Sequence, residues 1–425
     1  MGPIAWPLEE CTFDEGSPPP VDAARGGPVS AAVGLTLAVL TIAAFAAPLV
    51  AERTGVPGPV LELIVGLALG FALPSSTTGH GSFIGTLGTL GFLILMFLVG
   101  VEFDLSRIWR ASKSAVAVGV GLFGVSIVAS AVVLGQGLNA SALWVVSGAA
   151  TSVGITVPVL YTQGWLKNRF AQEAILIGTV AEFCYVVVLN AMSVAPSRGL
   201  DATILLATAR TLVAVVAALV LGYAVRRARS ATPHHFRRWY RRDDPIEVGL
   251  RGTFALLFLL VAASALVHIA LAMGAVLAGI VFRNVIGEPR ALIERLTSVA
   301  NSFFIPLFFI TVGVQTPLRL SLVALAPLVG AAILVQSVPR LLLVGYFSWR
   351  KIPLREGLAG SLLLMAPLTM LVTTAEIGER TGRLGPHNSA AMIVTAALSA
   401  LVFPVAARRL LIASPIEGDV ADTQS

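Results

Sequence analysis

The chain has 425 residues, of which 56% are hydrophobic and 12% are charged. A soluble globular chain carries about 25% charged residues, so this composition excludes a soluble fold and predicts a protein that crosses the membrane many times. The net charge of +6 would favour a nucleic-acid partner in a soluble protein, but here the basic residues lie in loops between apolar segments. We therefore expect an all-α polytopic membrane protein surrounded by the lipid bilayer, with no nucleic-acid partner and no cofactor.

Residues 1–29 are rich in Pro, Gly and acidic residues and lack the basic start of a signal peptide, which predicts a disordered tail. Residues 30–411 form the predicted transmembrane domain, and residues 412–425 a short cytoplasmic tail. Cys11 and Cys184 lie in different surroundings, so we expect neither a disulfide nor a metal site from them. Thirteen apolar segments are predicted at 30–51, 59–73, 84–101, 114–135, 142–160, 172–192, 202–225, 248–267, 270–286, 299–315, 321–348, 357–376 and 388–411.

The Lys and Arg residues alternate from one side of the segments to the other. One set of loops holds 21 of them and the other set holds 5, which supports the count of thirteen segments. Because basic loops face the cytoplasm, the split predicts a plasma-membrane protein with its N-terminus outside and its C-terminus in the cytoplasm. The basic loop from Arg226 to Arg242 belongs to the cytoplasmic set, where anionic lipid headgroups explain it better than nucleic acid does.

The sequence matches itself weakly at an offset of 213 residues. Phe97–Val101 (FLVGV) then aligns with Ile310–Val314 (ITVGV), and Gly66 aligns with Gly279. The offset displaces the chain by seven segments, an odd number, so the two halves would enter the membrane from opposite sides. We therefore predict two inverted repeats, an arrangement typical of secondary transporters. The predicted parts are a repeat at 30–192, a linker helix at 202–225 and a repeat at 248–411.

The fifth and twelfth segments both contain poor helix formers. The fifth includes Thr151, Ser152 and Gly154, and the twelfth holds Pro367 at the position that Gly154 reaches under the offset of 213. Irregular backbone at membrane depth is tolerated where its freed groups line a cavity. Two breaks at matching positions predict a crossed pair of discontinuous helices, with ordinary kinks as the alternative.

One acid interrupts the most apolar part of the sixth segment. Glu182 stands inside Ile175–Leu189 (ILIGTVAEFCYVVVL), near the middle of the predicted span. An ionised acid there costs about 2.5–3.5 kcal/mol even on insertion scales, so it is a functional candidate by default. Carboxylate oxygen suits a hard cation, and a proton can take the cation's place. We predict that Glu182 binds a proton and, transiently, a monovalent metal cation; the alternative is a structural carboxylate paired with a neighbouring helix.

Four longer stretches carry a family resemblance. They are Leu87–Leu105 (LGTLGFLILMFLVGVEFDL), Phe303–Val314 (FFIPLFFITVGV), Val60–Gly70 (VLELIVGLALG) and Gly274–Asn284 (GAVLAGIVFRN). Through them, over about residues 30–411, the sequence resembles the monovalent cation:proton antiporter-2 family, which includes bacterial sodium/proton exchangers and potassium-efflux systems. The resemblance implies a homodimer. It also implies a transport site with a Thr-Ser or Thr-Asp pair in the broken helix, a carboxylate in the next helix and a basic residue in the third-last helix.

The positions that match this pattern are Thr151 with Ser152, Glu182 and Arg340. The chain departs from the pattern in having Glu where Asp is usual and Arg where Lys is usual. Ala181 also precedes the carboxylate, where the family often has Asp, Asn or Gln. These departures leave ion selectivity and stoichiometry open, but they do not affect the expected fold.

Most residues around the predicted crossing have more than one interpretation. Thr151 and Ser152 either complete the cation's coordination or cap a half-helix, and both can hold together. Arg340 either neutralises dipoles at the crossing, pairs with Glu182 when the site is empty, or extends to the cytoplasmic interface. Pro367 supports the second break.

Other charged residues lie inside or near the ends of segments. Glu62, early in the second segment, is either a second acid of the access path or a structural residue that sits at the helix end or bonds across the bundle. Glu102 and Asp104 end the third segment, where we expect a solvated helix end, with an ion funnel as the alternative. Arg210 lies inside the seventh segment and is expected to face the bundle or to find a partner there.

These features predict a secondary active transporter that exchanges Na⁺ or K⁺ for H⁺ by alternating access. A single buried acid predicts electroneutral exchange of one cation for one proton. The alternatives are a symporter of a small organic anion on the same fold and a non-transporting membrane sensor. The sequence contains no H-E-x-x-H or G-x-S-x-G motif and no paired membrane aspartates, so we do not expect an enzyme.

Overall fold

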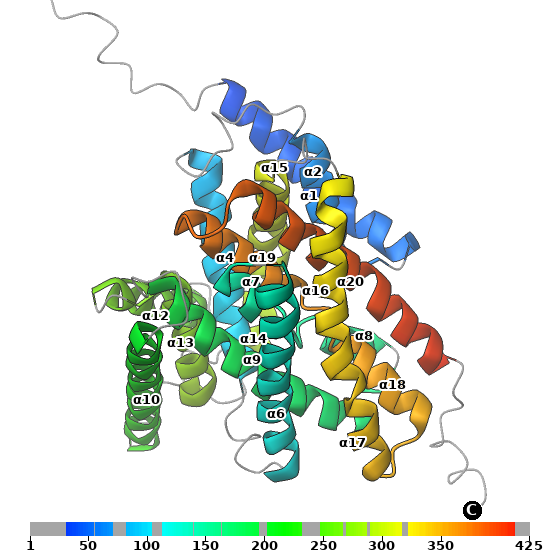
Figure 1. The fold of residues 1–425 in the computed structure, drawn as a ribbon. Helices are drawn as coiled ribbons and strands as arrows, with labels where there is room; N and C mark the ends of the chain where they lie inside the picture. The colour runs from blue at the N-terminus through cyan, green and yellow to red at the C-terminus, as the bar shows by residue number, and fades with distance from the viewer. Residues whose placement is uncertain are drawn as a thin grey trace, which may run out of the picture.

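In the residues that the computed structural model describes, every regular element is a helix (Figure 1). Nine helical stretches in these residues are long and apolar enough to cross a membrane, and three shorter apolar helices accompany them. The predicted all-α polytopic architecture is confirmed. The described ranges are 31–54, 56–70, 82–103, 113–138, 140–162, 164–194, 202–231, 247–266, 269–286, 290–316 and 322–412.

Each of the thirteen predicted segments corresponds to helix in the structure. The first seven are α1 (Ala31–Thr54), α2 (Gly58–Leu69), α4 (Phe83–Glu102), α6 (Lys113–Ser130) with the π-helix η1 (Ala131–Gly137), α7 (Ala142–Ser147) with α8 (Thr156–Thr162), α9 (Arg169–Val194) and α10 (Ala202–Ala231). The last six are α12 (Val248–Leu266), α13 (Leu271–Ile286), α14 (Arg290–Val299) with η3 (Ala300–Phe304) and α15 (Ile305–Gln315), α16 (Leu322–Leu341) with α17 (Leu343–Trp349), α18 (Leu354–Leu363) with α19 (Leu368–Arg380), and α20 (Pro386–Ile412).

Two boundaries differ clearly from the prediction. α10 continues to Ala231 instead of ending at 225, and the tenth segment begins at Arg290 instead of 299. The reason is that hydropathy marks the end of the bilayer and not the end of the helix. Both extensions contain Arg, which is a good helix former, so the helix continues past the apolar window.

α6 shows how these helices divide their faces between protein and bilayer. Its buried residues recur every three or four positions, which places them on one side of the helix: Ala115, Gly119, Leu122, Ser126 and Ser130. The opposite side exposes large apolar side chains, among them Val128 at 64%. Water would penalise such a surface, whereas lipid tails accept it, so the pattern agrees with a helix at the edge of a membrane bundle.

α2 and α15 cross so closely that only glycine fits at the contact. A Cβ atom at Gly66 would overlap the carbonyl oxygen of Ile310, and a Cβ atom at Gly313 would meet the carbonyl oxygen of Leu63. Small residues permit this close approach of two backbones in membranes. The two glycines therefore fix where the second and tenth segments cross.

The crossing of α4 and α13 repeats that geometry with the halves exchanged. Gly279 lies against the carbonyl oxygen of Phe97, and Gly100 lies against the carbonyl oxygen of Val276. Each of these four residues is the partner, under the offset of 213, of one residue in the α2–α15 crossing. The symmetry that the sequence predicted weakly is therefore present in the packing, and the inverted repeats are confirmed.

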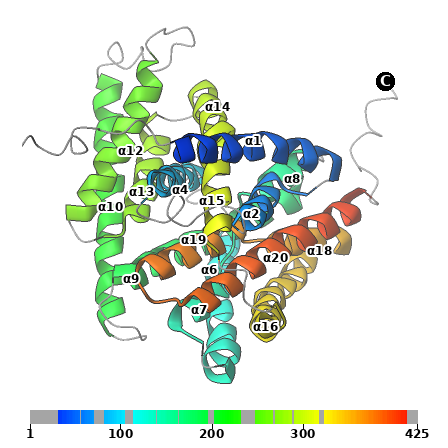
Figure 2. The same cartoon turned by 90° about the horizontal axis from the view of Figure 1, so that it is seen from above.

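The helices form two flanks with α9 between them. α10, α12 and α13, coloured green, stand together at one flank, and α16, α18 and α20, coloured yellow to red, stand at the other (Figures 1 and 2). α9 packs against α10 on one side and against α6 and α18 on the other. The predicted acid is thus carried by a helix that joins both flanks.

Candidate ion-binding site

Glu182 lies at the middle of α9 and is 2% exposed. Its Oε2 atom accepts a hydrogen bond from the backbone N–H of Val153 at 3.1 Å. Its Oε1 atom is buried and has no hydrogen-bond partner among the described residues. Burying an acid oxygen without a hydrogen-bond partner is unfavourable. The Oε1 atom of Glu182 is therefore a buried position at which a ligand can bind.

The backbone next to Glu182 is broken as predicted. α7 ends at Ser147, α8 begins at Thr156, and the residues between them are not helical. Ser152 lies in this gap; its hydroxyl accepts from the N–H of Gly154 at 3.3 Å and faces the Glu182 carboxylate. The gap therefore brings backbone groups and one hydroxyl to the open side of the acid.

The second break lies against the first. α18 ends at Leu363 and α19 begins at Leu368, with Pro367 directly before it. The hydroxyl of Thr156 donates to the carbonyl of Leu363 at 3.2 Å, which joins the two gaps directly. Pro367 lacks an N–H group, and its backbone angles of φ −83° and ψ 50° are not helical, so α18 and α19 are separate helices. The predicted crossed pair is confirmed, and simple kinks are excluded.

Arg340 of α16 reaches into the crossing and is fully buried. Its guanidinium group has five N–H donors, and all five are used. Nε donates to the Leu364 carbonyl at 3.1 Å, Nη1 donates to the carbonyls of Gly148 at 3.4 Å and Gln336 at 2.5 Å, and Nη2 donates to the Ala150 carbonyl and to the Thr151 hydroxyl at 2.9 Å. Arg340 therefore neither extends to the interface nor forms an ion pair with Glu182 in the described structure.

The two charges match the dipoles of the half-helices. Arg340 binds carbonyls at the ends of α7 and α18, where helix dipoles are negative. Glu182 accepts from the N–H of Val153, just before α8, where the dipole is positive. The crossing thus stabilises a cation on one side and an anion on the other without bringing the two side chains together.

The predicted site residues are therefore divided between two places. The structure brings Ser152 to Glu182, whereas Thr151 is bonded to Arg340. A cation-binding role for Thr151 would require it to turn away from the guanidinium group. Glu62 is buried, but it lies on α2, which packs mainly against α15 and α1.

Arg210 is exposed on α10 and lines a groove of about 890 Å³, whose other lining residues are mostly apolar side chains of α10, α12 and α13. The residue therefore lies at a space that α10 shares with two neighbouring helices. The apolar residues around it in the sequence did not indicate that this space is open.

Sequence reasoning also missed two hydroxyls at the site. Thr156 links the two breaks, and Tyr185, one turn after Glu182, shares a short hydrogen bond with Thr374 of α19. Both belong to stretches already noted, the polar break and the helix of the acid. The spacing of three residues between Glu182 and Tyr185 indicates that both lie on the same face of the helix. Nothing in the sequence indicates its partner in α19.

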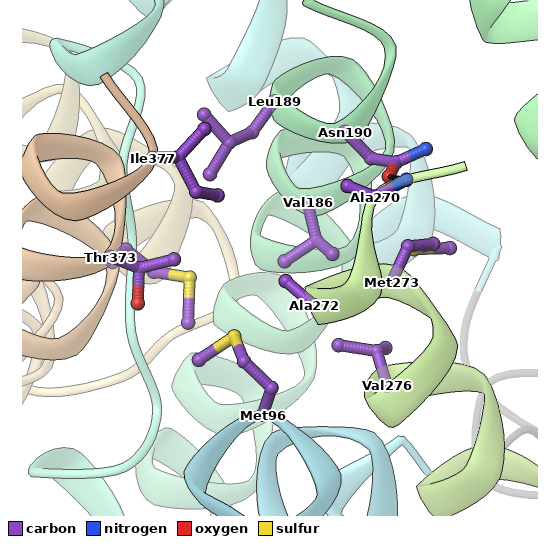
Figure 3. A pocket seen from close by; sticks show the side chains of 11 residues that line it. Met96, Val186, Leu189, Asn190, Ala270, Ala272, Met273, Val276, Thr373 and Ile377 are labelled. Carbon is purple, nitrogen blue, oxygen red and sulfur yellow. Dashed lines mark hydrogen bonds between the residues drawn. The ribbon is translucent and has the colours of Figure 1, made fainter. Parts of the chain in front are cut away.

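An apolar seam lies beside the C-terminal part of α9, beyond Glu182 along the helix (Figure 3). Figure 3 shows the side chains from α4, α9, α13 and α19 converging on a cavity of about 20 Å³. This is room for one water molecule at most. The lining residues include Met96, Val186, Leu189, Met273, Met370, Thr373 and Ile377. Methionine packs adaptably, so such a seam can close tightly without locking its helices in one register.

Polar contacts tie the same seam together. Arg380 of α19 donates to the hydroxyl of Thr89 on α4 at 2.7 Å. Asn190 of α9 accepts from the N–H of Ala270, directly before α13, at 3.2 Å. α9 and α19 are therefore joined to α4 and α13 on this side of Glu182.

Inverted repeats that cross through two broken helices at the depth of a buried acid are the architecture of a secondary transporter. The chain matches the family model for the transmembrane part of sodium/hydrogen exchangers over residues 39–413. This protein is a multi-pass membrane protein and belongs to the sodium/hydrogen exchanger family.

Named relatives agree with this assignment. The protein YjbQ of Bacillus subtilis (strain 168) is 25% identical over 399 residues, which cover 88% of this chain and 62% of YjbQ. The Na(+)/H(+)-K(+) antiporter GerN of Bacillus cereus is 24% identical over 266 residues, which cover 62% of this chain and 66% of GerN. The chain thus spans less than two thirds of either relative.

The sodium proton antiporter MjNhaP1 of Methanocaldococcus jannaschii aligns with a TM-score of 0.61 at 16% identity, over 90% of this chain and 98% of that one. At this identity the likeness shows the fold alone.

Proposed function

We propose that the chain is a secondary active transporter that exchanges a monovalent cation, Na⁺ or K⁺, for H⁺ by alternating access. The observation that carries the proposal is the Glu182 carboxylate, which is buried at the crossing with one oxygen bonded to Val153 and the other open. A proton or a hard cation can occupy that open oxygen, but not both at once. The name of GerN, an antiporter of Na⁺, H⁺ and K⁺, supports the choice of cations.

In this mechanism the cation and the proton compete for Glu182. Ser152 and the carbonyl groups of the break supply further oxygen ligands when the cation is bound. The proton neutralises the acid when the cation has left, so the site is never an unpaired charge in the bilayer. With one such acid the exchange is electroneutral. Alternating access needs a part that closes one side of the site while the other opens, and we assign this part to the seam of apolar side chains beside α9.

The geometry of Arg340 argues against symport of an organic anion. An anion would need a free cationic donor, but all five guanidinium N–H groups already bind protein oxygens. The open group at the crossing is a carboxylate oxygen, which repels an anion. Cation exchange is therefore the better reading. The predicted orientation, with the C-terminus in the cytoplasm, and the predicted homodimer belong to the same proposal.

Everted membrane vesicles with a pH-sensitive dye test the proposal. Adding Na⁺, K⁺ and Li⁺ in turn to vesicles that hold a proton gradient should release protons for at least one cation. Glu182→Gln should abolish this release. Glu173→Gln is the matched control, because Glu173 is a second buried acid on α9 whose oxygens are held by Tyr346 at 2.8 Å and Arg350 at 2.5 Å. Full exchange by Glu182→Gln would overturn the proposal.

A further inference from the structure

The end of α4 lies directly beside Glu182. The ring of Phe103, which follows α4, packs edge-on against the ring of Phe183, with centroids 5.4 Å apart and planes at 76°. Each phenylalanine comes directly after a glutamate, Glu102 in one case and Glu182 in the other. Phe103 is 1% exposed, so the contact fixes the backbone of the preceding residue. The backbones that carry the two acids are therefore joined by an aromatic contact between the residues that follow them.

The two acids differ in what surrounds them. Glu182 is buried with its Oε1 atom unpartnered among the described residues, whereas the Glu102 side chain is exposed at the end of its helix. Each acid is one residue away from the contact between the Phe103 and Phe183 rings, so the two acids lie where α4 ends against α9. Two carboxylates at close range repel each other unless a proton or a cation lies with them. The pair is thus unfavourable when empty and is relieved by the ions that the proposed exchange moves.

The surroundings of Glu182 differ toward the two ends of α9. Toward the C-terminal end lies the apolar seam, with a cavity of about 20 Å³. Next to Glu182, Phe183 contacts Phe103, which directly follows the exposed Glu102 at the end of α4. By the predicted orientation, this acidic side faces the cytoplasm. A cation that enters from there meets Glu102 before it meets Glu182.

We propose that Glu102 is a second carboxylate of the cation path, which captures the monovalent cation from the exposed side and hands it to Glu182. The inference rests on the proposed exchange function and adds a residue to it. Hard alkali cations take oxygen ligands and shed water stepwise, so an exposed acid next to a buried one lowers the barrier to entry. The proposal replaces the expectation of an ordinary solvated helix end at Glu102.

The test measures initial rates of cation-driven proton movement in proteoliposomes, against NaCl and KCl concentration. Glu102→Gln should raise the apparent KM for the cation about tenfold, the order expected when one steering charge is lost, with little change in maximal rate. Glu102→Asp keeps the charge and should stay within about twofold of the unmodified protein. Glu52→Gln is the control for lost negative charge, because Glu52 is exposed at the end of α1, which packs on α2, α15 and α4 and not on α9.

Each outcome decides something. An unchanged KM with a reduced maximal rate in Glu102→Gln, or a KM raised equally in Glu102→Asp, would show a structural role and overturn the inference. The variant's melting temperature in detergent, equal to that of the unmodified protein, shows that its fold is intact. If the unmodified protein drives no cation-dependent proton movement, the proposed function fails. If it does and Glu102→Gln behaves like Glu52→Gln, only this inference fails.

Discussion

In the first repeat α9 carries Glu182 at the crossing, whereas the equivalent position of α20 is Thr395. Thr395 is fully buried, and its hydroxyl donates to the Ala391 carbonyl of its own helix at 2.8 Å. In the second repeat α16 carries Arg340, whereas the equivalent residue of α6 is Ile127. The scaffold is thus repeated, but each repeat contributes one charge that the other lacks.

The residues that set the geometry of the crossing thus differ from the residues that bring charge to it. The close glycine crossings and the two breaks follow the symmetry of the repeat. The acid and the guanidinium group break that symmetry, one in each half. Equivalent substitutions at the glycine crossings and at the breaks should therefore have similar effects in the two repeats. Substitutions at the acid and at the guanidinium group should have no equivalent in the other repeat. Variants that copy one repeat into the other test this directly.

The largest expected effect comes from Glu182→Thr, which gives the first repeat the residue of the second. Exchange should fall to the level of liposomes without protein, because no group remains that can hold either a proton or a cation at this depth. Glu182→Asp keeps the carboxylate and should retain exchange within about tenfold. Cation-driven pH change in proteoliposomes measures both variants. A Glu182→Thr variant that exchanges at the normal rate would show that the chemistry lies elsewhere.

The next effect is on stability and comes from Arg340→Ile, which gives the second repeat the residue of the first. The carbonyls of Gly148, Ala150 and Leu364 lose their donor, and each buried unpaired group costs roughly 1–3 kcal/mol. For the three carbonyls together we expect a loss of about 3–9 kcal/mol in the free energy of unfolding. Arg340→Lys should lose less, because it keeps the charge but has fewer donors. Unfolding in mild detergent measures both; equal stability of Arg340→Ile would refute the capping role.

A third pair of variants tests the part that the repeats share. Gly66→Ala and Gly279→Ala each place a Cβ atom against a carbonyl oxygen, of Ile310 and Phe97 respectively. Each should destabilise the protein by about 1–3 kcal/mol, and the two losses should be similar because the crossings are equivalent. Gly121→Ala on α6 is the control, since a Cβ atom there meets nothing within 4 Å. Very different losses at the two crossings would contradict their equivalence.

The smallest effects distinguish the threonines of the two halves. Thr156→Val removes the bond to the Leu363 carbonyl across the breaks and should cost about 1 kcal/mol. Thr395→Val removes a bond within one helix turn and should cost less than about 0.5 kcal/mol, because the Ala391 carbonyl keeps its helical partner. Thermal unfolding of both variants under one condition gives the difference. Equal losses would remove Thr156 from the set of residues that join the breaks.

Much of this arrangement could be predicted from the sequence because its signals are local. Hydropathy located the thirteen segments, and the cluster of Thr151, Ser152 and Gly154 located the first break. The depth of Glu182 followed from its place in one apolar run. The offset of 213 worked because glycine is required where two backbones touch, so the pattern survived in both halves.

The rest depends on contacts between residues far apart in the chain. Thr156 binds a carbonyl 207 positions away, and Arg340 binds the Gly148 carbonyl 192 positions away. The nearness of Glu102 to Glu182 depends on how α4 ends beside α9, which no local pattern encodes. Arg210 is a further example, because the apolar residues next to it in the sequence did not indicate that it is exposed.

The most direct test of the central claim, that a proton and a cation compete for Glu182, is proton release on cation binding. The purified protein in weakly buffered detergent receives NaCl or KCl, with choline chloride as the ionic-strength control, and a pH indicator counts the protons released. The unmodified protein and Glu173→Gln should each release about one proton per chain when the cation displaces it. Glu182→Gln should release none. Equal release by Glu182→Gln would contradict competition at this carboxylate.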